Sequence, residues 1–148
     1  MLVALDTNIL VYLAGLDGAE RKDRCVAVVG VLPSRSIVVP VQVLAEMRRV
    51  LLKKGAGRVA AYEEIRKWAE LYRTVDTTYS VFEQSLELVH RHGMQVFDVI
   101  ILSASAGAGC SILLTEDGHH GFSWRDCTIV SPFHDPMHPL LIEALNKQ

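Results

Sequence analysis

The chain has 148 residues, of which 50% are hydrophobic and 22% are charged. This length suits one domain that buries roughly two-thirds of the surface of its unfolded chain, and the composition excludes a disordered protein. The formal net charge of −2 neither favours nor excludes nucleic acid as a partner, because charge can be gathered locally.

The sequence predicts a cytoplasmic protein that does not enter a membrane. No apolar run approaches the roughly 20 residues needed to span a bilayer. The amino-terminal apolar stretch lacks a basic leader and is interrupted by Asp6, so no secretory signal is expected. Cys25, Cys110 and Cys127 are an odd number at wide spacing among apolar neighbours. We therefore expect buried, reduced thiols.

In chain order, the apolar pattern predicts short buried strands that alternate with amphipathic helices. Strands are expected at residues 2–5, 37–39, 111–114 and 127–130, with a weaker candidate at 74–76. Helices are expected at residues 9–13, 25–32, 41–54, 58–72, 82–92 and 96–109. Such alternation is typical of a three-layer α/β domain with a parallel sheet.

Two of these helices have apolar stripes that we expect to face the core. In the 58–72 helix, the expected inner face is Tyr62, Ile65, Ala69 and Tyr72. In the 82–92 helix, it is Phe82, Leu86 and Val89, and His92-Gly93 provides a natural C-terminal stop.

Three acidic residues lie where predicted strands end or helices begin. Asp6 directly follows the first strand, Asp98 opens a helix, and Asp117 comes soon after the strand at 111–114. Right-handed crossovers place the carboxyl ends of parallel strands along one edge, where ligands bind. Each acid also has a structural interpretation. Asp6 and Asp98 suit helix N-caps, and Asp117-Gly118 is a common turn pair.

Glu46 lies in the middle of the predicted 41–54 helix, where capping is not possible, and it borders an apolar stripe. Its structural alternative is a surface ion pair with Arg49, worth about a few tenths of a kcal/mol. Two carboxylates about 5 Å apart repel by roughly 3 kcal/mol at an effective dielectric of 20. Four acids gathered at one edge would therefore need protonation or a cation. Oxygen-only ligands favour Mg²⁺ or Mn²⁺.

The four acids also lie in motifs that resemble, in order, those of PIN domains. Residues 5–10, Leu-Asp-Thr-Asn-Ile-Leu, resemble the opening motif, and residues 43–46 the second. Residues 96–101 with the small-residue helix that follows resemble the third motif, and residues 113–117 the fourth. The closing residues 128–133 are similar to the end of VapC toxins of type II toxin–antitoxin pairs. The resemblance spans residues 2–133.

This resemblance implies a PIN-like fold with a central parallel sheet of about five strands, and a Mg²⁺- or Mn²⁺-dependent ribonuclease. It implies that the metal is held by Asp6, Glu46, Asp98 and Asp117. Asn8 and Thr115 would be supporting polar groups, with local capping as the alternative. Glu116 could take the place of its neighbour Asp117. The resemblance also implies an RNA substrate, commonly a homodimer, and a small antitoxin that occludes the site.

Two features depart from the family pattern. His119 and His120 directly follow the last acid, and residues 134–148 continue beyond the usual end. We expect a PIN domain at residues 1–133 and an extension at 134–148 that packs on it, with Pro139 opening a short helix. His134 and His138 have a ligand-like spacing, but the proline between them interrupts a continuous helix, so no zinc site is expected.

The function expected from these residues is hydrolysis of RNA by metal-activated water. The alternative from a different class is an inactive PIN scaffold or an RNA-binding subunit. Phosphoryl transfer through an aspartyl phosphate at Asp6 is disfavoured, because Asn8 stands where a second aspartate is needed. The basic residues between 48 and 58 are interpreted as a solvated helix face, with RNA contact as the alternative.

Overall fold

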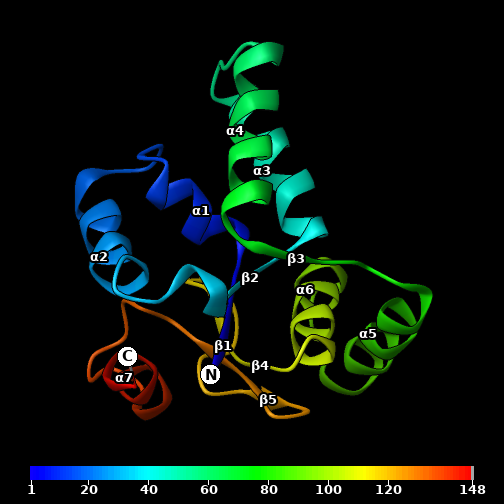
Figure 1. Cartoon of the computed structure of the whole chain (residues 1–148). Helices are drawn as coiled ribbons and strands as arrows, with labels where there is room; N and C mark the ends of the chain where they lie inside the picture. Colours follow the sequence, from blue (N-terminus) through cyan, green and yellow to red (C-terminus); the bar gives the residue numbers. More distant parts are fainter. Residues whose placement is uncertain (148) are drawn as a thin grey trace.

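The computed structural model describes residues 1–147, which form a six-stranded sheet flanked by helices (Figure 1). The strands are β1 (Leu2–Leu5), β2 (Ile37–Pro40), β3 (Arg73–Val75), β4 (Cys110–Leu114), β5 (Ser123–Trp124) and β6 (Cys127–Val130). The helices are α1 (Thr7–Leu13), α2 (Ala19–Val29), α3 (Val41–Lys53), α4 (Arg58–Leu71), α5 (Tyr79–His92), α6 (Val96–Gly107) and α7 (Pro139–Asn146), with one 3₁₀ turn at Ser34–Ser36.

The sheet has the order β3-β2-β1-β4-β6-β5, and β1 lies inside it. All neighbouring pairs from β3 to β6 are parallel, which confirms the expected parallel sheet of about five strands. Parallel strands covered on both faces read as continuous apolar runs. All residues of β2 and β6 are buried accordingly. The three cysteines are buried and free, as expected.

The short strand β5 was not expected, and it pairs antiparallel with β6 at the edge of the sheet. Only Arg125 and Asp126 separate the two strands, and both have positive φ, 45° and 67°. Positive φ at both central residues is the geometry of the two-residue hairpin turn that matches strand twist. In a sequence this turn is usually recognised from Asn-Gly or Asp-Gly, so the pair Arg125-Asp126 did not indicate a hairpin.

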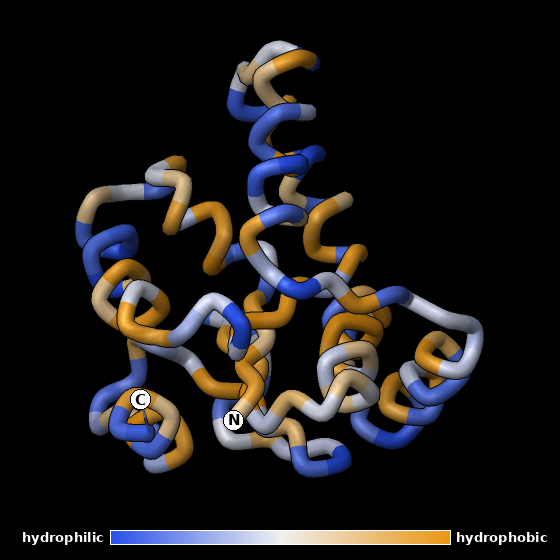
Figure 2. The backbone as a smooth tube through the Cα atoms, viewed as in Figure 1, coloured by the Kyte–Doolittle hydropathy of each residue, from blue (hydrophilic) through white to orange (hydrophobic). Residues whose placement is uncertain are grey.

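Helices cover both sides of the sheet, which confirms the three-layer arrangement. Figure 1 shows α1 and α2 on one side and α5 and α6 on the other, while α3 and α4 pack together and project from the body. Helix α6 buries a continuous run, Val99 to Ser105. The strands at the centre are mainly hydrophobic and α4 is largely hydrophilic (Figure 2). Within residues 1–147, no helix is long and apolar enough to cross a membrane.

The inner faces of α4 and α5 match the predicted ones only in part, because Ile65, Ala69, Tyr72 and Val89 are half-buried against the core as expected. Helix α4 buries Ala61 and Trp68, whereas Tyr62 is 62% exposed. Helix α5 buries Ser85 and Leu88, whereas Phe82 and Leu86 are exposed. Both helices pack chiefly on a neighbouring helix, α4 on α3 and α5 on α6. A narrow helix–helix contact selects one of several overlapping apolar stripes, and periodicity alone does not distinguish them.

Helix α7 occupies the chain beyond the last strand and begins at Pro139, with His138 as its N-cap. Leu141 is fully buried and Ala144 is nearly buried, which shows that one face of the helix packs against the rest of the molecule.

Because Leu141 is fully buried, Leu141→Ala should lower the free energy of unfolding by roughly 2–5 kcal/mol. Its neighbour Ile142 is 45% exposed, and Ile142→Ala should change stability by no more than about 0.5 kcal/mol. Urea denaturation of the two variants measures the difference. Equal effects would mean that α7 does not pack in this way.

Candidate functional site

Asp6 is buried at the end of β1, with only 9% of its surface exposed. Its backbone amide donates to the Leu114 carbonyl at 3.0 Å, which fixes it beside the end of β4. Its carboxylate caps α1, because Oδ1 accepts from the Thr7 amide at 2.6 Å. Oδ2 accepts from the Thr115 hydroxyl at 2.7 Å. The capping interpretation is thus correct for Asp6, and it leaves the side chain at the carboxyl edge of the sheet.

Helix α3 brings Glu46 to the start of α1. Glu46 Oε2 accepts from the Thr7 hydroxyl at 2.7 Å, and Oε1 accepts from Gln42 Nε2 at 3.0 Å. Among residues 1–147, Glu46 forms no ion pair with Arg49, so the surface-pair interpretation is wrong. Thr7 and Gln42 were not singled out in the sequence. Two features of the sequence could have indicated these partners of Glu46. Thr7 lies inside the opening motif, and Gln42 lies one helical turn before Glu46.

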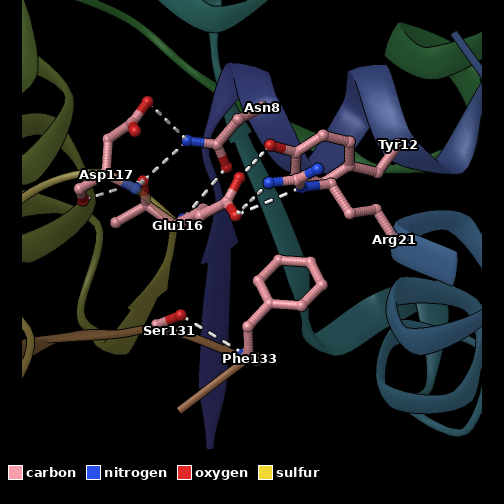
Figure 3. A network of polar contacts seen from close by, with 8 residues as sticks. Asn8, Tyr12, Arg21, Glu116, Asp117, Ser131 and Phe133 are labelled. Atoms are coloured by element: carbon pink, nitrogen blue, oxygen red, sulfur yellow. Dashed lines mark hydrogen bonds and ion pairs between the residues drawn. The ribbon is translucent and has the colours of Figure 1, made fainter. Parts of the chain in front are cut away.

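Asn8 joins α1 to the loop after β4. Its Nδ2 donates to Thr115 Oγ1 at 2.9 Å and to Asp117 Oδ2 at 3.2 Å. Its Oδ1 accepts from the Glu116 backbone amide at 3.2 Å. Figure 3 shows Asn8 placed between Asp117 and Glu116. Asn8 and Thr115 therefore orient Asp6 and Asp117 directly.

Asp98 lies in the first turn of α6 but does not cap it, because the side chain of Gln95 accepts from the Phe97 amide instead. The N-cap interpretation of Asp98 is therefore wrong. Asp98 lines a small hollow of about 50 Å³ together with Asp6, Thr115 and Asp117. Burial raises its pKa, and the negative charges of Asp117 and Glu46 raise it further.

Burial and neighbouring negative charges also act on Asp6, whose pKa is raised from 3.8 to about 6. Burial is the largest cause, and the charges of Asp98 and Glu46 add to it, against the hydrogen bonds from Thr115 and Thr7. In the described part of the chain, no lysine, arginine or histidine pairs with any of the four acids. Their mutual repulsion is thus met by neutral donors alone.

Glu116 belongs to a separate cluster on the other side of the loop. Its carboxylate accepts from the Tyr12 hydroxyl and from Arg21, whose Nη2 and Nε lie 3.0 and 3.2 Å from Oε1 (Figure 3). Burial alone would raise the pKa of Glu116, but the hydrogen bonds from Tyr12 and Arg21 outweigh it and lower the pKa. Asp117, and not Glu116, therefore faces the other acids.

The histidines beyond Asp117 divide between two places. His119 lines the same small hollow as Asp6, Asp98 and Asp117. His120 stacks on His134, with ring centroids 3.9 Å apart, and meets the edge of His138 at 5.4 Å. Burial lowers the pKa of His120, and the two neighbouring imidazoles lower it further. His120 thus connects the loop after β4 to the segment that leads into α7.

The four acids offer the oxygen donors that a hard divalent cation prefers. With the side chains in the described arrangement of residues 1–147, no group of three or more His, Cys, Asp or Glu is placed to hold a metal ion. The residues still fit such an ion by their chemistry. A buried carboxylate and three neighbours repel one another without a compensating side-chain cation, and the electrostatic cost falls when a cation binds among them.

Comparison with known proteins defines the class. A family model of the PIN domain matches residues 3–122, most of the chain. The chain belongs to the PIN domain family. Among curated proteins, none matches this sequence at a significant level.

Several solved structures share the fold. VapC20 of Mycobacterium tuberculosis, a sarcin–ricin loop cleaving toxin, is 18% identical, with a TM-score of 0.66 over 78% of this chain and 90% of that one. A toxin–antitoxin complex from Klebsiella pneumoniae is 17% identical, with a TM-score of 0.68 over 88% and 98%. VapBC2 of Rickettsia felis, bound to a DNA fragment from the promoter, is 15% identical, with a TM-score of 0.63 over 88% and 98%.

The raised pKa of Asp6 makes the stability of the metal-free protein fall as pH rises. Between pH of about 4 and 6 the folded state binds more protons at Asp6 than the unfolded state, so deprotonation favours unfolding. A shift from 3.8 to about 6 corresponds to roughly 3 kcal/mol. Asp6→Asn should therefore gain stability over wild type across this window, up to about that amount, in urea denaturation with EDTA present.

The exposed Asp76 supplies the control, since Asp76→Asn removes the same charge without relieving burial. If Asp6→Asn showed the same pH dependence as wild type, the buried carboxylate would not carry the effect.

Proposed function

We propose that this protein is a Mg²⁺- or Mn²⁺-dependent endoribonuclease and the toxin of a toxin–antitoxin pair. The observation that carries the proposal is the coupling of four acids from four separate parts of the chain. Asp6 ends β1, Glu46 comes from α3, Asp98 from α6 and Asp117 from the loop after β4. Their charges raise the pKa of Asp6 and Asp98, so they share one electrostatic environment.

In this proposal Asp6, Glu46, Asp98 and Asp117 hold the metal. The bound ion would supply a water of lowered pKa and offset negative charge on the phosphodiester. The surrounding side chains fix the ligands. Thr7 and Gln42 orient Glu46, Thr115 orients Asp6, and Asn8 orients Asp117. Such outer partners matter, because their loss typically costs about 10- to 100-fold in metal affinity or activity.

The comparisons support the biological part of the proposal. The chain shares its family with nucleases that generally use divalent metals, and one structural neighbour is a sarcin–ricin loop cleaving toxin. Two further neighbours are structures of a toxin with its antitoxin. We therefore propose an RNA substrate and a small antitoxin partner. We also propose a homodimer and a cytoplasmic location, as expected from the sequence. Residues 134–148 are proposed to be an extension that belongs to the same domain.

A PIN scaffold or RNA-binding subunit without turnover is the second candidate. It is favoured by one observation, that no three acidic or histidine side chains among residues 1–147 are arranged to hold a metal. The four coupled acids weigh against it, because a scaffold gains nothing from uncompensated repulsion. Calorimetric titration with Mg²⁺ separates the two candidates. Binding that Asp6→Asn weakens supports the nuclease, and no binding at millimolar Mg²⁺ supports the scaffold.

Asp117→Asn should lower the rate of Mn²⁺-dependent RNA cleavage by at least about 100-fold, the upper end of the cost for losing an outer partner of a metal. Asp6→Asn should do the same. The adjacent Glu116→Gln is the matched control, because this carboxylate faces Tyr12 and Arg21, and its rate should stay within several-fold of wild type. Gel assays of a labelled RNA measure all three.

The opposite pattern, with Glu116→Gln inactive and Asp117→Asn active, would reverse the assignment of the fourth acid. Cleavage at the wild-type rate by all three variants would refute the nuclease proposal.

A further inference from the structure

Two adjoining hollows flank Glu46 along α3. One, of about 200 Å³, is lined by Thr7, Glu46, Arg49, Val50 and Lys53. The other, of about 220 Å³, is lined by Gln42, Ala45, Glu46, Arg49 and Phe97. Because Glu46 and Arg49 line both, the two hollows lie side by side along α3, with Lys53 in one and Phe97 in the other. We call the two hollows together the α3 groove.

Phe97 ends the α3 groove and directly precedes Asp98. Its side chain is 53% exposed, although the run from Val99 to Ser105 in the same helix is buried. A single exposed apolar residue is ordinary on a protein surface. Here, however, the exposed ring lies next to the acids and opposite a cationic helix face. Its ring is accessible, and it contributes little to the core.

Arg49 and Lys53 supply that cationic face. They are one helical turn apart on α3, so they project to the same side. In the part of the chain that the structure describes, neither forms an ion pair. The acid nearest to Arg49 in sequence, Glu46, already accepts hydrogen bonds from Thr7 and Gln42. Both cations are therefore available to an anion that lies in the groove.

We propose that the α3 groove binds single-stranded RNA, with an unpaired nucleobase stacked on Phe97 and the adjacent phosphates on Arg49 and Lys53. This inference rests on the proposed ribonuclease function and names the residues of this chain that contact the RNA. An aromatic ring stacks on any base but needs the face of the base to be free, which a duplex denies. The groove thus selects an unpaired segment or loop, and the neighbouring Asp98 places the acids close to the stacked nucleotide.

The composition of the groove favours RNA over a protein partner. Protein–protein interfaces are rich in aromatic residues and arginine but depleted of lysine and glutamate, and the α3 groove has both Lys53 and Glu46. The α3 groove has one aromatic ring, two free cations and an acid at its centre. Cations beside an aromatic platform are instead the usual arrangement for single-stranded nucleic acid.

Fluorescence anisotropy with a labelled oligoribonucleotide in EDTA tests the inference, because binding is then measured without cleavage. Phe97→Leu should weaken binding of the single strand by about 5- to 100-fold, the range expected for one lost stack. Phe97→Trp should bind at least as well as wild type. Arg49→Gln should weaken binding and reduce the slope of log affinity against log salt concentration by about 0.7, the value for one phosphate contact to a single strand. A blunt-ended duplex of the same strand with its complement should bind Phe97→Leu and wild type alike.

Two exposed residues outside the groove are matched controls. Tyr79→Leu removes an aromatic ring from α5, and Arg48→Gln removes a cation from α3, and both should bind the single strand like wild type. Retention of wild-type affinity by Phe97→Leu would overturn the inference. If that variant instead changed the oligomeric state in sedimentation, the face would be a protein interface, and the inference would also fail.

Failure here is distinguishable from failure of the nuclease proposal. If Phe97 governs single-strand binding but Asp6→Asn cleaves as fast as wild type, the groove stands and the assigned catalytic site fails. If Asp6→Asn abolishes cleavage while Phe97→Leu binds normally, the nuclease stands and the groove fails.

Discussion

Asp6 is nearly buried at the end of an inner strand, where its ionised carboxylate is only partly stabilised by the Thr7 amide and the Thr115 hydroxyl. Burial and the charges of Glu46 and Asp98 oppose ionisation. The surrounding structure keeps this arrangement because each participating residue is fixed by an element of the sheet or its helices. A cation bound beside this carboxylate would relieve the unfavourable charge, and the proposed metal site depends on that relief.

The parallel topology explains how residues far apart in sequence reach this position. The ends of β1 and β4 are held side by side by the amide of Asp6 on the carbonyl of Leu114. That contact brings the loop with Thr115 and Asp117 to the start of α1. Helices α3 and α6 then approach with Glu46 and Asp98. Ligand sites at the carboxyl ends of parallel strands arise in this way.

The strands and helices were predictable because their apolar residues recur with a clear period. The acids could be selected as candidate site residues because they follow strands or lie within motifs. Side-chain partners were less predictable. The structural alternatives were that Asp98 caps α6 and that Glu46 pairs with Arg49, but Gln95 caps the helix and Thr7 binds Glu46. The predicted inner faces of α4 and α5 were wrong in part for a similar reason. Local spacing favours several partners, and tertiary packing selects one. Tyr12 and Arg21 gave no signal, because their partner Glu116 lies about a hundred residues later in the chain.

Glu116 and Asp117 are neighbours in sequence, yet their carboxylates turn to opposite sides, one toward Tyr12 and Arg21 and the other toward Asn8. The side to which each carboxylate points therefore depends on its position in the loop after β4. Inserting a single residue behind Thr115 would shift which carboxylate faces which side. The guanidinium of Arg21 would lose its anion, and the longer glutamate would enter a space shaped for an aspartate. The length of this loop is thus as strict a requirement as its chemistry.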